Sequence, residues 1–115
     1  MSNERLIRTV ARLEFQMELI QSLVDPERDP FAYLVFENEL PREQHQDILG
    51  YMDSLNARLA KGIEISRNEF ESKIYQIVPS REGNYHFAEN IVRTLKKSSR
   101  YEAVCEELKK RGMNI

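Results

Sequence analysis

Apolar side chains recur at alternating spacings of four and three near the start of the chain, at Leu6, Val10, Leu13, Met17, Ile20 and Val24. This is the spacing of a heptad seam, and it predicts a long helix over about residues 3–24. At 100° per residue, a second apolar group lies on the opposite side of the same helix, where a surface helix is ordinarily polar. This group is Ala11, Phe15 and Leu19. The helix therefore has two apolar faces.

Two apolar faces on one helix predict self-association, because the rest of the chain can readily cover only one of them. The hypothesis is that the seam packs on a second long helix, residues 40–61, while the Phe15 face meets a second copy of the protein. The reverse assignment stays open, as does the choice between a dimer and a trimer. The candidate interface residues are Ala11, Phe15 and Leu19 on one face, and Met17 and Ile20 in the seam.

The remaining pattern predicts five further helices, over about residues 29–36, 40–61, 66–78, 85–97 and 99–112. Asp29 followed by Pro30 is a typical helix start. Ser66 with Glu69 has the spacing of a capping box, and residues 99 and 102 repeat that spacing at the last helix. Residues 31–36 are apolar all round, which predicts a short buried helix. A strand paired with residues 63–65 is the alternative, since periodicity does not separate the two.

Length and composition agree with a single all-α domain over residues 1–115. The chain has 115 residues, of which 41% are hydrophobic and 31% charged, with only four glycines and four prolines. We therefore expect a compact multi-helix bundle of about six helices with a long N-terminal heptad-patterned helix. No signal segment or membrane span is evident, and a lone cysteine allows no intramolecular disulfide. These features predict a cytoplasmic protein that does not engage membranes.

No arrangement of residues predicts catalysis, a metal or a cofactor. His45 and His86 are far apart and do not fall in the spacings that place two ligands on one helical face. The acidic residues around 37–53 are typical of the solvated side of a helix. Cys105 lies on an apolar stripe and is predicted to be a small core residue. The four glycines are isolated, so no phosphate-binding loop is present.

A basic group near the C-terminus provides the alternative function, a nucleic-acid-associated regulator. Its residues are Arg93, Lys96, Lys97, Arg100, Lys109, Lys110 and Arg111. Residues 85–112 could form a helix-turn-helix, yet the would-be recognition helix carries three glutamates that would repel phosphates. Lysines in the last turn of a helix also serve to offset its dipole, by about 0.3–1 kcal/mol each. With a net charge of −2, the chain is thus predicted not to bind nucleic acid.

Several short segments resemble the YhaI-like proteins of Bacillus and its relatives, a family of small helical proteins of unknown function. They are Arg12-Leu13-Glu14-Phe15, Asp29-Pro30-Phe31-Ala32-Tyr33-Leu34, Gly62-Ile63-Glu64-Ile65-Ser66 and Ser99-Arg100-Tyr101-Glu102. The resemblance implies an all-α, self-associating fold and supplies no catalytic residues; the chain departs from the family around residues 79–88. The sequence thus predicts a non-catalytic homo-oligomer that acts as a protein-interaction or regulatory adaptor.

Overall fold

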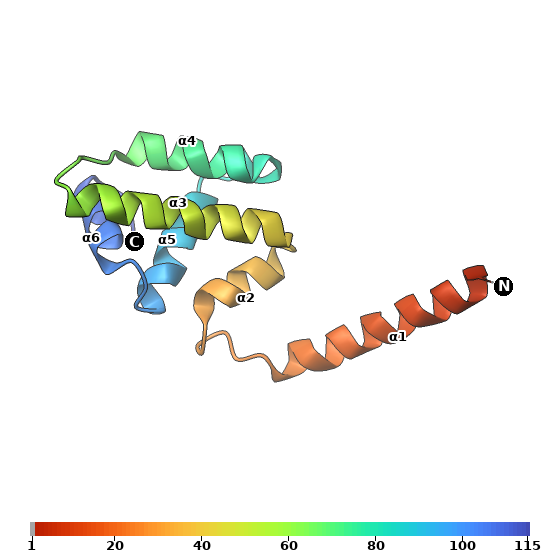
Figure 1. The fold of residues 1–115 in the computed structure, drawn as a ribbon. Coiled ribbons are helices and arrows are strands. Elements are labelled where there is room, and N and C mark those ends of the chain that lie inside the picture. The colour runs from red at the N-terminus through yellow and green to blue at the C-terminus, as the bar shows by residue number, and fades with distance from the viewer. Residues whose placement is uncertain (1) are drawn as a thin grey trace.

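A computed structural model of the chain describes residues 2–115, with the backbone alone for Ser2. The regular elements in this part of the chain are all helices, and none is a strand. The α-helices are α1 (Ser2–Leu23), α2 (Pro30–Glu37), α3 (Arg42–Ala60), α4 (Arg67–Ile77), α5 (Phe87–Lys97) and α6 (Glu102–Lys110), and a short 3₁₀ turn, η1 (Pro79–Arg81), follows α4 (Figure 1). The prediction of a six-helix, all-α protein is confirmed for the described part of the chain. The strand alternative for residues 31–36 is wrong, because they lie in α2.

Residues 30–115 form the body of the molecule, a bundle of five short helices around one core. The pairs that pack are α2 with α5, α3 with α4 and α6, and α5 with α4 and α6. The buried hydrophobic residues come from all five helices and from the segments that follow α3, α4 and α6. The largest of them are Phe31, Phe70, Phe87, Ile48, Met52, Leu55, Ile65, Ile74, Ile91, Leu95, Leu108 and Val78.

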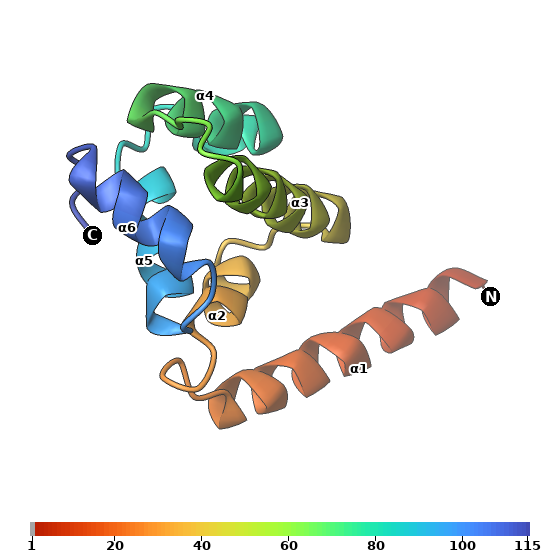
Figure 2. The ribbon, with the colours of Figure 1, turned by 60° about the vertical axis from the view of Figure 1, so that its left-hand side comes forward.

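Helix α1 stands away from this body as an arm, which is plain in two views of the ribbon (Figures 1 and 2). The molecule measures 60 × 27 × 25 Å, with a radius of gyration of 17.2 Å. A compact domain of this length would have a radius of gyration of about 13 Å. The excess comes from α1, which belongs to none of the extensively packed helix pairs.

The predicted packing of the seam on residues 40–61 is therefore wrong. The apolar stripe of α3, Ile48, Met52 and Leu55, is fully buried, but it is covered by α4 and α6. The short helices that follow α3 return to it and fill its apolar side. No part of that stripe is left for α1.

Most helix ends follow the local sequence signals. The Asp29 carboxylate accepts a hydrogen bond from the Ala32 backbone N–H at 3.1 Å, and Pro30 begins α2. The capping box of α4 is complete, because Ser66 Oγ accepts from Glu69 N–H and Glu69 Oε1 accepts from Ser66 N–H, both at 3.1 Å. These local contacts fix where α2 and α4 start.

The predicted second capping box, Ser99 with Glu102, is wrong. Ser99 has φ 55° and ends α5: its N–H bonds the carbonyl of Lys96, and the next N–H bonds that of Leu95. This pair of bonds is a Schellman motif, which satisfies carbonyls at a helix C-terminus. Helix α6 instead begins after Tyr101, with no side-chain cap. The same spacing of residues can therefore serve either end of a helix.

Candidate interaction surface

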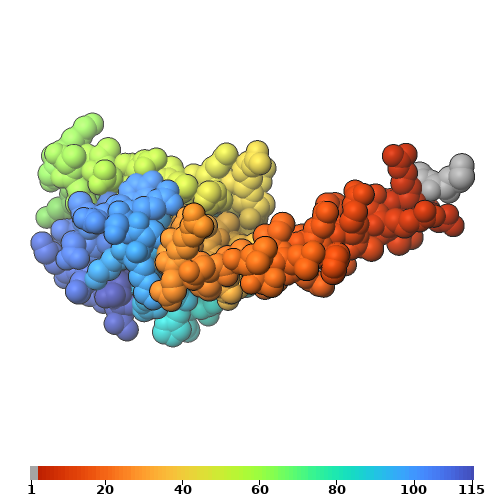
Figure 3. All heavy atoms as spheres, turned by 90° about the horizontal axis from the view of Figure 1, so that it is seen from below, coloured from red at the N-terminus to blue at the C-terminus, as the bar shows by residue number. Residues whose placement is uncertain are grey.

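The most unusual surface of the molecule is α1, whose apolar side chains lie in solvent. Among residues 3–29, Thr9 is half-buried and every other residue is exposed. Ten large hydrophobic residues of this segment are between 37% and 84% exposed: Leu6, Ile7, Val10, Leu13, Phe15, Met17, Leu19, Ile20, Leu23 and Val24. The space-filling view shows α1 extending beyond the body along nearly its whole length (Figure 3). Exposed apolar patches on this scale are typical of protein–protein or membrane interaction sites, so α1 is the candidate interaction surface.

Both predicted faces of α1 are open. Phe15 and Leu19 on one face are 58% and 49% exposed, and Met17 and Ile20 in the seam are 55% and 57% exposed. Ala11 is exposed as well. Every candidate interface residue is therefore exposed on α1, and neither face is packed on the body.

Two grooves run beside the C-terminal half of α1, where it passes α2. One is lined by Met17 and Gln21 of α1 and by Ala32, Val35, Phe36, Glu37, Glu39 and Leu40; we call it the Leu40 groove. The other is lined by Ile20, Leu23 and Val24 together with Asp25, Arg28, Asp29, Ala32, Tyr33 and Phe36; we call it the Tyr33 groove. The apolar surface of α1 thus continues onto α2.

Sequence reasoning missed the part of this surface that α2 supplies. The prediction that residues 31–36 are buried holds for Phe31 and Leu34 alone; Ala32 is exposed, and Tyr33, Val35 and Phe36 are half-buried. An all-apolar segment has no polar side that would show which residues face away from the core. Only the position of α2 at the edge of the body reveals its outward side.

The structure does not gather the seven basic candidates into one patch. Helix α6 begins beside the end of α5 and runs back along it (Figure 2), so Lys96 and Lys97 lie at one end of α6 and Lys109 and Lys110 at the other. Nine helical residues separate these ends by about 13 Å.

The three arginines of this group make contacts within the chain. Arg93 donates to the carbonyl of Asn114 at 2.8 Å, and Arg111 donates to Glu107 at 3.1 Å. The guanidinium of Arg100 lies over the rings of Phe31 and Tyr101, 5.8 and 5.9 Å from their centroids. These contacts give all three side chains a structural role.

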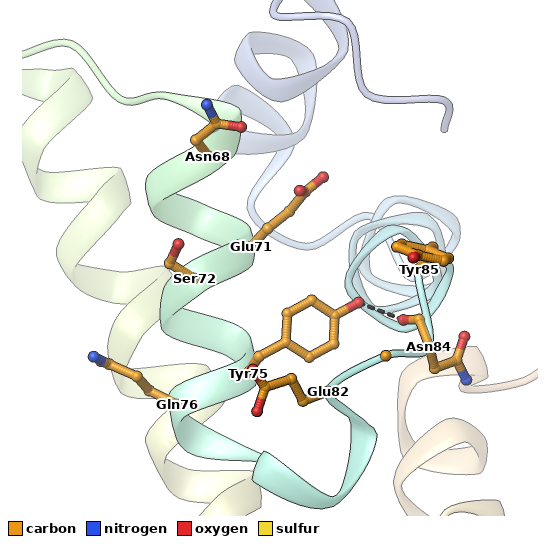
Figure 4. Close-up of a pocket in the computed structure, with 9 residues that line it drawn as sticks. Asn68, Glu71, Ser72, Tyr75, Gln76, Glu82, Asn84 and Tyr85 are labelled. Atoms are coloured by element: carbon orange, nitrogen blue, oxygen red, sulfur yellow. Dashed lines mark hydrogen bonds between the residues drawn. The ribbon is translucent and has the colours of Figure 1, made fainter.

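A polar hollow lies between α4 and the segment that precedes α5 (Figure 4). Tyr75 crosses it, and its hydroxyl donates to the carbonyl of Asn84 and lies 3.4 Å from the Ala88 N–H. Glu71 and Glu82 lie at its walls. The tyrosine here ties the connecting segment to α4.

Beside this hollow, one carboxylate is buried in the body. Glu89 of α5 has one oxygen 3.6 Å from Arg67 Nη2 and the other 3.5 Å from His86 Nδ1. Arg67 also donates to Glu71 at 2.8 Å and to the carbonyl of Gly112 at 2.9 Å. The cluster links α4, α5 and the C-terminal segment, because a buried charge needs such partners.

Cys105 is a core residue, as predicted. Its side chain is almost fully buried, and its Sγ lies 3.8 Å from the carbonyl of Val92 and 3.7 Å from that of Arg100. Burial raises the pKa of the thiol to about 11. His45 stacks on the Phe31 ring, with centroids 5.7 Å apart. Among the described residues, no three His, Cys, Asp or Glu side chains are grouped to hold a metal ion.

Comparisons of the chain with protein-family models, with curated proteins and with solved structures found no match. The resemblance to the YhaI-like proteins therefore stays a prediction. None of the helices in the described part of the chain is both long and apolar enough to cross a membrane. The inference about function rests on the surface of α1.

Proposed function

We propose that this protein is a homo-oligomer assembled through α1, and that it acts as a protein-interaction or regulatory adaptor without catalytic activity. The observation that carries the proposal is the exposure of the ten large apolar side chains between residues 6 and 24. Most helices in proteins owe their stability to packing of an apolar face, and α1 belongs to none of the extensively packed helix pairs. A second copy supplies an apolar surface of matching length.

The free energies support such an assembly. Complete burial of a Val, Leu, Ile, Phe or Met side chain contributes about 1.5–3 kcal/mol. The six seam residues are 37–61% exposed, so covering them in two copies contributes on the order of 9–18 kcal/mol. Association costs about 4–15 kcal/mol in lost freedom of motion. At the midpoints of these ranges the gain exceeds the cost by about 4 kcal/mol, whereas a micromolar Kd requires about 8 kcal/mol, so apolar residues outside the seam must contribute as well.

Light scattering after size exclusion tests the proposal, with circular dichroism to follow the fold. The unchanged protein should elute as an oligomer at micromolar concentration. Met17→Glu in the seam should lower the mass toward that of one chain while the body stays folded, because Met17 does not belong to its core. The same result for Phe15→Glu would place the opposite face of α1 in the assembly as well. Elution of the unchanged protein as a single chain would refute self-association.

Ile63→Glu is the matched control. Ile63 lies between α3 and α4 and is 48% exposed, close to the 55% of Met17, yet it is not part of α1. The control should keep the mass of the unchanged protein. If it dissociates the oligomer as strongly as Met17→Glu does, the interface lies on the body and not on α1.

A further inference from the structure

The exposed seam of α1 keeps one heptad register from end to end. If Val10 is placed at position a of a heptad written abcdefg, every seam residue falls on a or d. Position a then holds Asn3, Val10, Met17 and Val24, and position d holds Leu6, Leu13 and Ile20. All seven residues are exposed. The seam is therefore free to pack on another helix along its whole length.

The residue types in the seam favour two parallel strands. β-branched residues at a with leucine at d are typical of parallel two-stranded coiled coils. Two of the four a residues are valine and two of the three d residues are leucine, with Met17 and Ile20 as the apolar exceptions.

Asn3 is a second signal for the same arrangement, because a single asparagine at position a specifies the register and number of strands. In a parallel pair, Asn3 lies opposite Asn3 of the second copy. An antiparallel pair with fully overlapped seams instead places Val10 opposite Ile20, and Asn3 opposite residue 27. That residue lies past the end of the other helix at Leu23, so only the parallel pair gives Asn3 a partner.

Glu14 indicates the direction of the two helices. It occupies position e, which in a parallel pair lies beside position g of the other helix, here the uncharged Thr9. In the antiparallel pair the overlapped seams have their midpoint at residue 15. The two copies of Glu14 then lie on the same side, about 3 Å apart along the axis. Two like charges meet in the antiparallel pair and not in the parallel one.

A helix on the seam also reaches the accessible side of α2. Met17 lines the Leu40 groove, and Ile20 and Val24 line the Tyr33 groove; α2 forms the other wall of both. In a parallel pair both bodies lie at the same end of the coil, beside the C-terminal halves of the two α1 helices. The accessible apolar residues of α2 then add to the area that the seam buries.

We propose that the seams of two copies form a parallel two-stranded coiled coil, with both bodies at its C-terminal end. This proposal rests on the proposed self-association and specifies the number and direction of the chains. The two-fold axis runs along the coil, so each seam residue meets the same residue of the second copy.

Disulfide trapping tests the direction of the helices. In a Cys105→Ser background, Val10→Cys chains should link to one another on oxidation, as seen on a non-reducing gel. In an antiparallel pair the two Val10 positions lie ten residues apart, about 15 Å along the axis, which is too far for a disulfide. Phe15→Cys is the matched control, because Phe15 is 58% exposed, against 43% for Val10, but lies on the opposite face. The control should link far more slowly.

A mixture of Val10→Cys chains with Ile20→Cys chains, in the same background, reports the alternative. The parallel pair gives Val10–Val10 and Ile20–Ile20 links, whereas the antiparallel pair gives the mixed Val10–Ile20 link. Peptide mapping of the cross-linked product identifies which has formed. The mixed link, or absence of the Val10–Val10 link, would overturn the parallel coil.

An added charge at Thr9 tests the same arrangement without a covalent bond. Thr9→Lys and Thr9→Glu place opposite charges beside Glu14 of the second copy only in the parallel pair. Sedimentation equilibrium at low salt should give a dissociation constant about fivefold or more lower for Thr9→Lys than for Thr9→Glu, and high salt should reduce the difference. Adding Glu14→Gln should abolish the advantage of lysine. No advantage of lysine, or one that survives Glu14→Gln, would contradict the parallel coil.

The outcomes also separate the parallel coil from self-association itself. If the unchanged protein is a single chain in solution, both proposals fail. If Met17→Glu dissociates an oligomer whose links are of the mixed kind, self-association through α1 stands and the parallel direction is wrong. If the oligomer has the mass of three or more chains, self-association stands and the two-stranded coil is wrong.

Discussion

The arm, residues 2–29, exposes its hydrophobic side chains, whereas the body, residues 30–115, buries most of its own. In the body, helices of 8–19 residues turn their apolar stripes toward one another, and 18 hydrophobic side chains are buried. In the arm, a helix of 22 residues with as clear an apolar pattern buries none of its large side chains. The difference shows that an apolar stripe predicts a contact but does not say whether the contact lies within the chain.

The strongest contrast in stability is expected between two phenylalanines, one in each region. Phe70→Ala should lower the free energy of unfolding by about 3–5 kcal/mol, because it opens a cavity in the core of the body. Phe15→Ala should change the stability of the dissociated protein by less than about 0.5 kcal/mol, as surface substitutions do. Denaturant titration followed by circular dichroism measures both. Comparable losses would show that α1 packs on the body.

The second prediction is that burial protects Cys105, the one cysteine of the sequence, from thiol reagents. With the pKa of Cys105 at about 11 against an ordinary 9, the thiolate population at pH 8 should be about a hundredfold lower than in the unfolded chain. Labelling with a thiol reagent should therefore be slow in the native protein and fast in denaturant. Fast native labelling would place the thiol at the surface.

The same pKa shift gives the sign of a pH effect on stability. The folded-state pKa of Cys105 is raised, so the unfolded chain releases its proton at lower pH than the folded protein does. Stability should be unaffected below pH 8 and should fall as the pH rises from 9 toward 11. In Cys105→Ala the loss of stability between pH 9 and 11 that is due to this thiol should disappear. Denaturation midpoints measured across that pH range check this.

A smaller effect is expected at the start of α4. Ser66→Ala removes the acceptor for the Glu69 N–H and should lower the free energy of unfolding by about 1 kcal/mol. Ser22→Ala is the comparison in the arm: its hydroxyl donates to the Leu19 carbonyl within α1, and its loss should leave the midpoint of the body unchanged. Equal shifts in the two variants would argue against independent stability of the body.

The smallest effect concerns the end of α5. Ser99 has a left-handed backbone, which costs a residue with a side chain about 1–2 kcal/mol relative to glycine. Ser99→Gly should therefore stabilise the body by about 0.5–1 kcal/mol after the entropy cost of glycine is included. The neighbouring Ser98 has φ −82°, so Ser98→Gly should be destabilising. Stabilisation by both substitutions would contradict the Schellman assignment.

The sequence predicted the helices well because their signals are local. The Asp29 cap and the Ser66 capping box each depend on residues within one turn of one another. Ser99 shows the limit of such signals. A serine three residues before a glutamate fits a helix start, but the N–H groups of Ser99 and Arg100 donate to the carbonyls of Lys96 and Leu95 and end the preceding helix there.

Local spacing along the chain was enough to predict an all-helical protein, a buried Cys105 and two apolar faces on α1. No local pattern predicted that α4 and α6 cover α3, that α1 stands free, or that α2 leaves Tyr33, Val35 and Phe36 accessible beside it; the packing of the whole chain shows these features. The physical reason is that helix formation depends on neighbours three and four residues apart. Which apolar stripes pack together depends on competition among segments far apart in the chain. Here α4 and α6 cover the apolar side of α3, so α1 cannot pack there.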